Sequence, residues 1–180
     1  AITVDDGPTA SNLQSALQDD GGLLTEYTPE SATDVPDDVP VLPASPAVGD
    51  AFYFGSVKRF GFLTITMTTP GVGIWSVIWE YWNGVAWVPF PAQCALVDGT
   101  AGFTLTGELL VTVTSLPVDW TTVVVKGVVP FYYWRARVDF SLGGLTQALA
   151  GKIQVQVPNL LNATGEDNTI AWAILDWKDQ

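Results

Sequence analysis

Histidine is absent from the chain, cysteine occurs once (Cys94), and only seven of the 180 residues are Lys or Arg. The absence of imidazole excludes histidine-based catalysis and histidine metal ligands. A single cysteine excludes an internal disulfide and a thiolate zinc site. The chain also has 19 acidic residues and a formal net charge of −12, which argues against nucleic acid as a partner because phosphates require a basic surface.

The sequence also lacks the patterns that direct a chain to a membrane. Residues 1–6 are acidic rather than a basic stretch followed by an apolar run, so we expect no secretory signal. The longest uncharged stretch, residues 60–79, alternates threonine with apolar side chains and is interrupted by Pro70, Gly71 and Gly73. That composition does not suit a membrane-spanning helix. We therefore expect a chain made in a cytosol, without a membrane partner.

The acidic residues are concentrated near the N-terminus. Residues 1–50 contain ten acidic residues and no Lys or Arg, whereas residues 51–180 contain nine acidic and seven basic residues. Six of the 12 prolines also fall within residues 1–50. Proline at this spacing favours extended backbone. The sequence therefore predicts an extended acidic arm over residues 1–49 and a separate domain over residues 50–180.

The arm contains one pattern typical of a short helix. Leu13, Ala16 and Leu17 would share one helical face, and Gly21 and Gly22 would end the helix. A disordered acidic tail is the alternative, but the arm has more apolar side chains than a spacer needs. We expect it to dock in a groove, on its own domain or on a neighbouring subunit, and we favour the neighbour. The side chains expected to dock are Leu13, Leu17, Leu23, Leu24, Tyr27, Val39, Val41 and Leu42.

From residue 50 onward the sequence is typical of β-strands. No long amphipathic helical pattern is present. Polar and apolar residues alternate at residues 60–69 and 152–157, and other strand patterns occupy residues 108–114, 131–140 and 169–176. The sequence therefore predicts an all-β fold, an antiparallel and jelly-roll-like β-sandwich with the acidic arm in front of it.

Residues 79–88 predict a β-hairpin whose turn is Asn83-Gly84, a pair that favours the two positive φ angles of a type I′ turn. Alternation along the first strand places Trp79 and Tyr81 on one face and Glu80 and Trp82 on the other. Both faces therefore have a large ring.

Four side chains are candidates for contact with a partner. Trp79, Trp120 and Trp134 are expected in the core, whereas Trp82 and Trp87, beside the turn, suit contact with a partner as well as burial. Arg135 and Arg137 are two residues apart, so on a strand they share a face. A neighbour's acidic arm is their expected counterpart, and two solvated strand charges are the alternative.

No pattern predicts catalysis or metal binding. Glu80, Glu108 and Asp139 could pair as glycosidase carboxylates, but no nucleophile, cofactor or metal motif accompanies them. The spacing of an EF-hand calcium loop is missing at the adjacent acids of residues 5–6, 19–20 and 37–38. We therefore assign no catalytic, cofactor-binding or metal-binding residue and expect no enzymatic activity.

Five motifs follow one another in a fixed order: WEYWNGVAWVP at 79–89, DGTAGFT at 98–104, a strand opening at Gly107, PVDW at 117–120 and YWRARV at 133–138. This series resembles a β-sandwich module of the structural proteins of tailed viruses of bacteria and archaea, including tail, baseplate, fibre and capsid-surface proteins. The likeness covers about residues 50–140 and excludes the arm and the segment after residue 141. It implies an assembly or adhesion unit rather than an enzyme.

Composition and resemblance together predict a non-enzymatic structural protein of a virus particle, on the capsid surface as a decoration, turret or spike component. We expect it to assemble through its arm and sheet edges with copies of itself and with other virion proteins, such as the major capsid protein or tail proteins. One alternative is a tail, baseplate or fibre protein. The other is a carbohydrate-binding adhesion module that uses Trp82 and Trp87 to bind host surface glycans. The expected location is the virion, after synthesis in the host cytoplasm.

Overall fold

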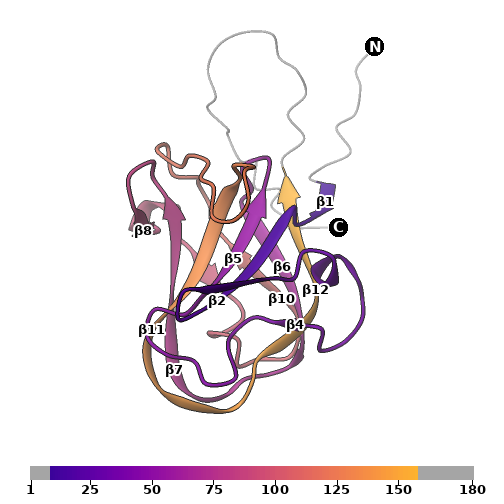
Figure 1. Ribbon diagram of the computed structural model, residues 1–180. Helices are drawn as coiled ribbons and strands as arrows, with labels where there is room; N and C mark the ends of the chain where they lie inside the picture. The colour runs from indigo at the N-terminus through magenta and orange to yellow at the C-terminus, as the bar shows by residue number, and fades with distance from the viewer. Residues whose placement is uncertain (1–8, 158–180) are drawn as a thin grey trace, which may run out of the picture.

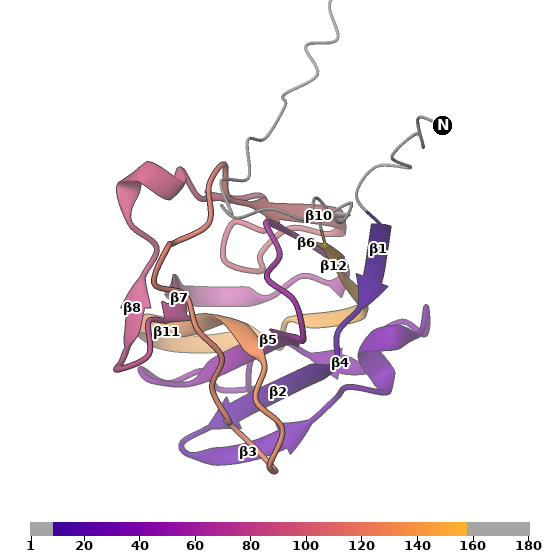
Figure 2. The ribbon, with the colours of Figure 1, turned by 90° about the horizontal axis from the view of Figure 1, so that it is seen from above.

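A computed structural model of the chain describes residues 9–157. Within them the chain forms two antiparallel six-stranded sheets that pack face to face, with β10, β6, β12 and β1 on one side of Figure 2 and β2, β5 and β11 on the other. The predicted all-β sandwich is confirmed. Residues 1–8, and the strand expected at residues 169–176, lie outside the described part of the chain.

The first sheet, called sheet A, has the order β1-β12-β6-β10-β9, and β4 also pairs with β12. Leu63, Ile65 and Met67 are buried on its inner face, whereas Thr64 and Thr66 alternate with them on the outer face. The alternation predicted for residues 60–69 is thus confirmed. The strands of sheet A are β1 (Thr9–Asn12), β4 (Val39–Pro40), β6 (Phe62–Thr69), β9 (Val97–Asp98), β10 (Gly107–Thr112) and β12 (Leu149–Val157).

The second sheet, called sheet B, has the order β3-β2-β5-β11-β7-β8. Its strands are β2 (Ser15–Asp20), β3 (Leu23–Glu26), β5 (Ala51–Ser56), β7 (Val72–Trp82), β8 (Trp87–Pro89) and β11 (Tyr132–Thr146). Two short 3-10 helices, η1 (Glu30–Ala32) and η2 (Ala92–Cys94), lie in the connections. β7 and β11 extend together to the lower end of the molecule, opposite the end at which β1 begins and β12 finishes (Figure 1).

Aromatic rings fill the centre of the core between the sheets. Trp79, Trp120 and Trp134 are all buried, as expected from the sequence. Phe60 contacts two of them, with its ring centroid 4.9 Å from that of Trp134 and 5.3 Å from that of Trp120. Tilted and edge-on contacts of this kind add to the free energy gained by burying the rings.

The predicted helix near the N-terminus is wrong, because residues 15–20 form strand β2 between β3 and β5. Ala16 packs into the main core between the sheets, while Leu17 packs on the opposite face beside Tyr53 and Tyr133. A strand buried on both faces loses its polar–apolar alternation, and here the apolar residues fall at helical spacing by coincidence. Gly21 and Gly22, with φ of 59° and 92°, form the turn from β2 to β3.

The expected docking of this segment on a neighbouring subunit is also wrong for its large apolar residues. Five of the eight side chains predicted to dock are buried in the chain's own core clusters: Leu13, Leu17, Val39, Val41 and Leu42. Leu24 and Tyr27 are half-buried against the same clusters, and Leu23 is exposed. Residues 9–49 therefore belong to the sandwich, and the predicted domain boundary at residue 49 does not separate two folded units.

The hairpin predicted at residues 79–88 is confirmed, with a different turn. Trp82 pairs with Trp87, so the loop contains four residues rather than two. Gly84 has a positive φ of 96°, but Asn83 does not. The Asn83 side-chain oxygen instead accepts hydrogen bonds from the backbone N–H groups of Val85 (3.0 Å) and Ala86 (2.9 Å).

Ionisation of the Tyr81 hydroxyl is expected to lower the stability of the fold at alkaline pH. Burial, followed by its hydrogen bond to Asp119 (2.9 Å), raises the pKa of Tyr81 to about 12. A phenol whose pKa is raised by folding contributes stability that is complete below its unfolded pKa near 10 and is lost as the pH rises toward 12. We expect Tyr81→Phe to remove roughly 2–3 kcal/mol of this pH dependence. Urea unfolding at pH 8 to 12 measures it, and parallel curves for the two proteins would contradict it.

Candidate functional site

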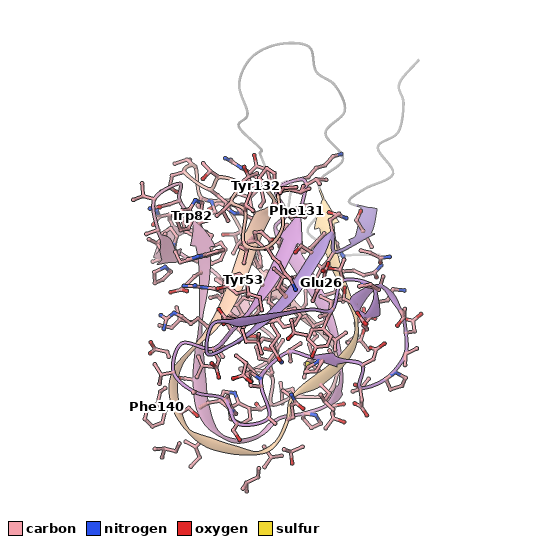
Figure 3. All side chains as sticks on the ribbon, viewed as in Figure 1. Glu26, Tyr53, Trp82, Phe131, Tyr132 and Phe140 are labelled. Atoms are coloured by element: carbon pink, nitrogen blue, oxygen red, sulfur yellow. The ribbon has the colours of Figure 1, made fainter. Side chains whose placement is uncertain are left out.

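The four predicted contact residues come together on the outer face of sheet B. Cross-strand pairing places Tyr53 of β5 beside Arg135 of β11, and Arg135 beside Glu80 of β7. Because side chains alternate along each strand, Arg137 and Trp82 share this face, and Trp87 of β8 pairs with Trp82. Figure 3 shows where Tyr53 and Trp82 lie on this side of the molecule. We call the set the arginine–aromatic cluster: Tyr53, Glu80, Trp82, Trp87, Arg135 and Arg137.

Glu80 is the centre of the cluster, and only 3% of its surface is exposed. One carboxylate oxygen accepts hydrogen bonds from Nε (2.8 Å) and Nη2 of Arg135. The other accepts from Nη2 of Arg137 at 3.0 Å. The hydrogen bond to Glu80 raises the pKa of the Arg137 guanidinium above its ordinary value. A buried carboxylate is thus satisfied by two cations, as buried charges require.

This ion-pair network corrects one prediction. Arg135 and Arg137 do share a strand face, but their counterpart is Glu80 on the adjacent strand, and their charges need no acidic arm from a neighbour. Arg137 makes a second, looser ion pair with exposed Asp139 (3.7 Å). The sequence contained each of these residues, but their pairing depends on the order of strands in the sheet.

Two aromatic rings pack against the guanidinium of Arg135. Its guanidinium lies 4.5 Å from the ring centroid of Trp87 and 5.7 Å from that of Tyr53. Trp87 also meets Trp82 edge-on at 5.6 Å. Both tryptophans are half-buried, and their contact with a partner stays a prediction. Cations stacked on desolvated rings are held more firmly than cations in water.

The other half of this sheet face is covered by the chain itself. Val123, Val125 and Phe131, from the segment before β11, pack on Tyr53 and Tyr133. Lys126 ties this segment to β3 by donating a hydrogen bond to the carbonyl oxygen of Leu24 (3.1 Å). The surface available to a partner is therefore the half that contains Trp82, Trp87 and Arg137.

At Gly55, which pairs with Tyr133 across β5 and β11, the addition of one methyl group is expected to destabilise the fold. A Cβ on Gly55 would lie 2.5 Å from the Tyr133 ring and 2.9 Å from Cβ of Ser15. The ring is fixed, because it is buried and its hydroxyl donates a 2.8 Å hydrogen bond to Ser15 Oγ. We expect Gly55→Ala to lower the free energy of unfolding by about 1–3 kcal/mol. Chemical denaturation measures the loss, and it should shrink in a Tyr133→Leu background, where an unchanged loss would contradict the clash.

Of the three carboxylates considered as catalytic partners, Glu80 and Asp139 pair with the same Arg137, and Glu108 lies apart from them. Glu108 lies on sheet A, opposite Thr66, whereas Glu80 lies on the outer face of sheet B and is bound by two arginines. A shallow polar depression on sheet A is lined by Glu108, Lys152, threonines and glutamines, and Lys152 pairs with Asp34 at 3.5 Å. Within residues 9–157, no three His, Cys, Asp or Glu side chains are grouped as a metal site.

No protein-family model, curated protein or solved structure matches this chain. In the part of the chain that the structure describes, no helix has the length and apolar character needed to cross a membrane. The geometry of the arginine–aromatic cluster is therefore the main structural evidence on function.

Proposed function

We propose that this chain is a non-enzymatic structural subunit of a tailed-virus particle, exposed on the capsid surface, that contacts another subunit through the arginine–aromatic cluster. The observation that carries the proposal is the gathering of Trp82, Trp87, Arg135 and Arg137 on one sheet face. Trp and Arg are the residue types that most often dominate the energy of protein interfaces. The five ordered sequence motifs, which resemble a module of tailed-virus structural proteins, support the assignment of this contact to a virus particle.

The cluster is suited to contact because it is held in place before a partner arrives. Glu80 fixes both guanidinium groups, and Trp87 covers Arg135, so little side-chain entropy is lost on binding. Its two cations are balanced by buried Glu80 and exposed Asp139, so the cluster is locally neutral in an acidic chain, with guanidinium groups as its hydrogen-bond donors. A partner surface with carboxylates or carbonyl groups beside apolar side chains complements it.

The glycan-binding alternative has less support from this geometry. Sugar rings stack on flat, open aromatic faces. Here Arg135 lies over the Trp87 ring, and Trp82 meets that ring at 64° rather than side by side in one plane. A glycan array compared between the native chain and Trp82→Ala tests this alternative, since an assembly protein binds no sugar.

Immunogold electron microscopy of virus particles from the source, with antibody raised against the full chain, tests the proposal. Gold over the head or at many vertices is the expected result. Gold confined to the tail or its tip would transfer the role to a baseplate or fibre protein, and particles without gold would overturn the proposal. Incorporation of Trp82→Ala should fall relative to Val118→Ala, a matched control at a 94% exposed valine.

A further inference from the structure

The outer edge of β7 is unpaired over most of its length. Sheet B ends with β8, but β8 pairs with only the last three residues of β7, from Glu80 to Trp82. Residues 72–78 have β11 on one side. On the other side, no strand from the described part of the chain pairs with them.

The direction of the free backbone groups follows from the paired part of the strand. Phe90 N donates a hydrogen bond to the carbonyl oxygen of Trp79, so the backbone groups of Trp79 point toward the β8 side. Backbone groups alternate in direction along a strand. Those of Gly73, Trp75 and Val77 therefore point to the same side, where no described strand pairs with them, and a row of such groups is a template for another strand.

The side chains around this edge are apolar and exposed. Ile74 is 60% exposed and Leu142, on the adjacent strand β11, is 72% exposed. Phe140 pairs with Ser76 across the two strands and points away from the molecule at its lower end in Figure 3. We call this group the apolar end: Val72, Ile74, Phe140, Leu142 and Leu145.

The distribution of charged residues indicates which kind of partner suits this surface. The chain has a formal net charge of −12, yet residues 60–79 and 140–151 contain no charged side chain. At the apolar end two copies meet without placing charged side chains against each other. The unpaired strand edge of each copy is then the pairing partner of the same edge in the other copy.

We propose that the apolar end binds a second copy of this chain. Two β7 edges pair antiparallel about a twofold axis, so that the two B sheets join into one continuous sheet and the exposed side chains of the two ends pack together. This inference rests on the proposed role in assembly, and it names a second copy of the chain as the partner that binds the apolar end. It uses an end of the molecule distinct from the arginine–aromatic cluster.

Sedimentation equilibrium of the purified full chain tests the pairing. The native chain should form dimers, and Ile74→Lys should raise the dissociation constant at least tenfold, because it places two like charges across the axis. Val85→Lys is the matched control: it adds the same charge at an 85% exposed valine in the β7–β8 loop and should leave the dimer unchanged. Circular dichroism should show that both variants are folded.

Amide hydrogen exchange identifies the edge that pairs. In the native dimer the amides of Gly73, Trp75 and Val77 should exchange slowly, and in Ile74→Lys they should exchange at least tenfold faster. A native chain that stays monomeric, a dimer unaffected by Ile74→Lys, or a monomer with these amides already protected would each overturn the pairing. The immunogold result is independent of these outcomes, so failure of the dimer and failure of the virion role are distinguishable.

Discussion

Removal of residues 1–49 is expected to abolish folding rather than to release a soluble domain. β2 lies inside sheet B and pairs with β5 over five residue positions, from Ser15 to Asp19. The deleted segment also supplies five large side chains to the core, each contributing roughly 1.5–3 kcal/mol through burial. The whole stability of a domain is only about 5–15 kcal/mol. The remaining chain would also expose β5, with Phe52 and Phe54, as an apolar edge.

The soluble fraction, circular dichroism and thermal melting of a chain beginning at residue 50 measure this effect. A soluble 50–180 chain with a sharp melting transition would contradict the placement of β2 in the sheet.

Glu80→Ala is expected to lower the free energy of unfolding by about 3–5 kcal/mol, the cost of leaving buried charges without their partner. Arg135 and Arg137 both depend on this carboxylate, and the side chain of Arg135 is only 13% exposed. The loss is a large part of the total stability of a domain. Glu80→Gln should cost less, because an amide oxygen still accepts a hydrogen bond from a guanidinium.

Urea unfolding at neutral pH compares these variants with the native chain. Asp139→Ala is the matched control, since Asp139 is an exposed carboxylate that pairs with the same Arg137 at 3.7 Å. An exposed pair contributes less than about 1 kcal/mol, so this variant should remain close to the native stability. Equal losses for Glu80→Ala and Asp139→Ala would show that burial of Glu80 is not what makes it important.

The sequence predicted the parts of the fold where one strand face is buried and the other is exposed. The alternation predicted at residues 60–69 and 152–157 arises for that reason, and these residues fall in or beside β6 and β12 of sheet A. It failed at β2, where Ala16 and Leu17 are buried on opposite faces and leave no alternation to read. The composition of residues 1–49 indicated an arm because proline and aspartate are frequent there, yet Val39, Val41 and Leu42 are buried in the core.

The sequence singled out four of the six residues of the arginine–aromatic cluster, but it did not indicate Tyr53, the ion-pairing role of Glu80 or the pairing between strands. Spacing alone places Arg135 and Arg137 on one strand face, and the position beside the turn singles out Trp82 and Trp87. The role of Glu80 depends on β7 lying next to β11, although 49 residues lie between Trp82 and Tyr132 along the chain. Short-range patterns do not contain that information, because register between distant strands is a property of the folded sheet.

The pairing of Thr9 with Val157 has a mechanical consequence. The described chain enters and leaves the sandwich at adjacent positions on antiparallel strands, at the upper end of Figure 1. Tension applied between these two points would break the hydrogen bonds between β1 and β12 one after another. The force would not be shared by all of the bonds at once. A chain held at both of these points would therefore yield at low force, whereas load applied through the faces of its sheets would act on the packed core.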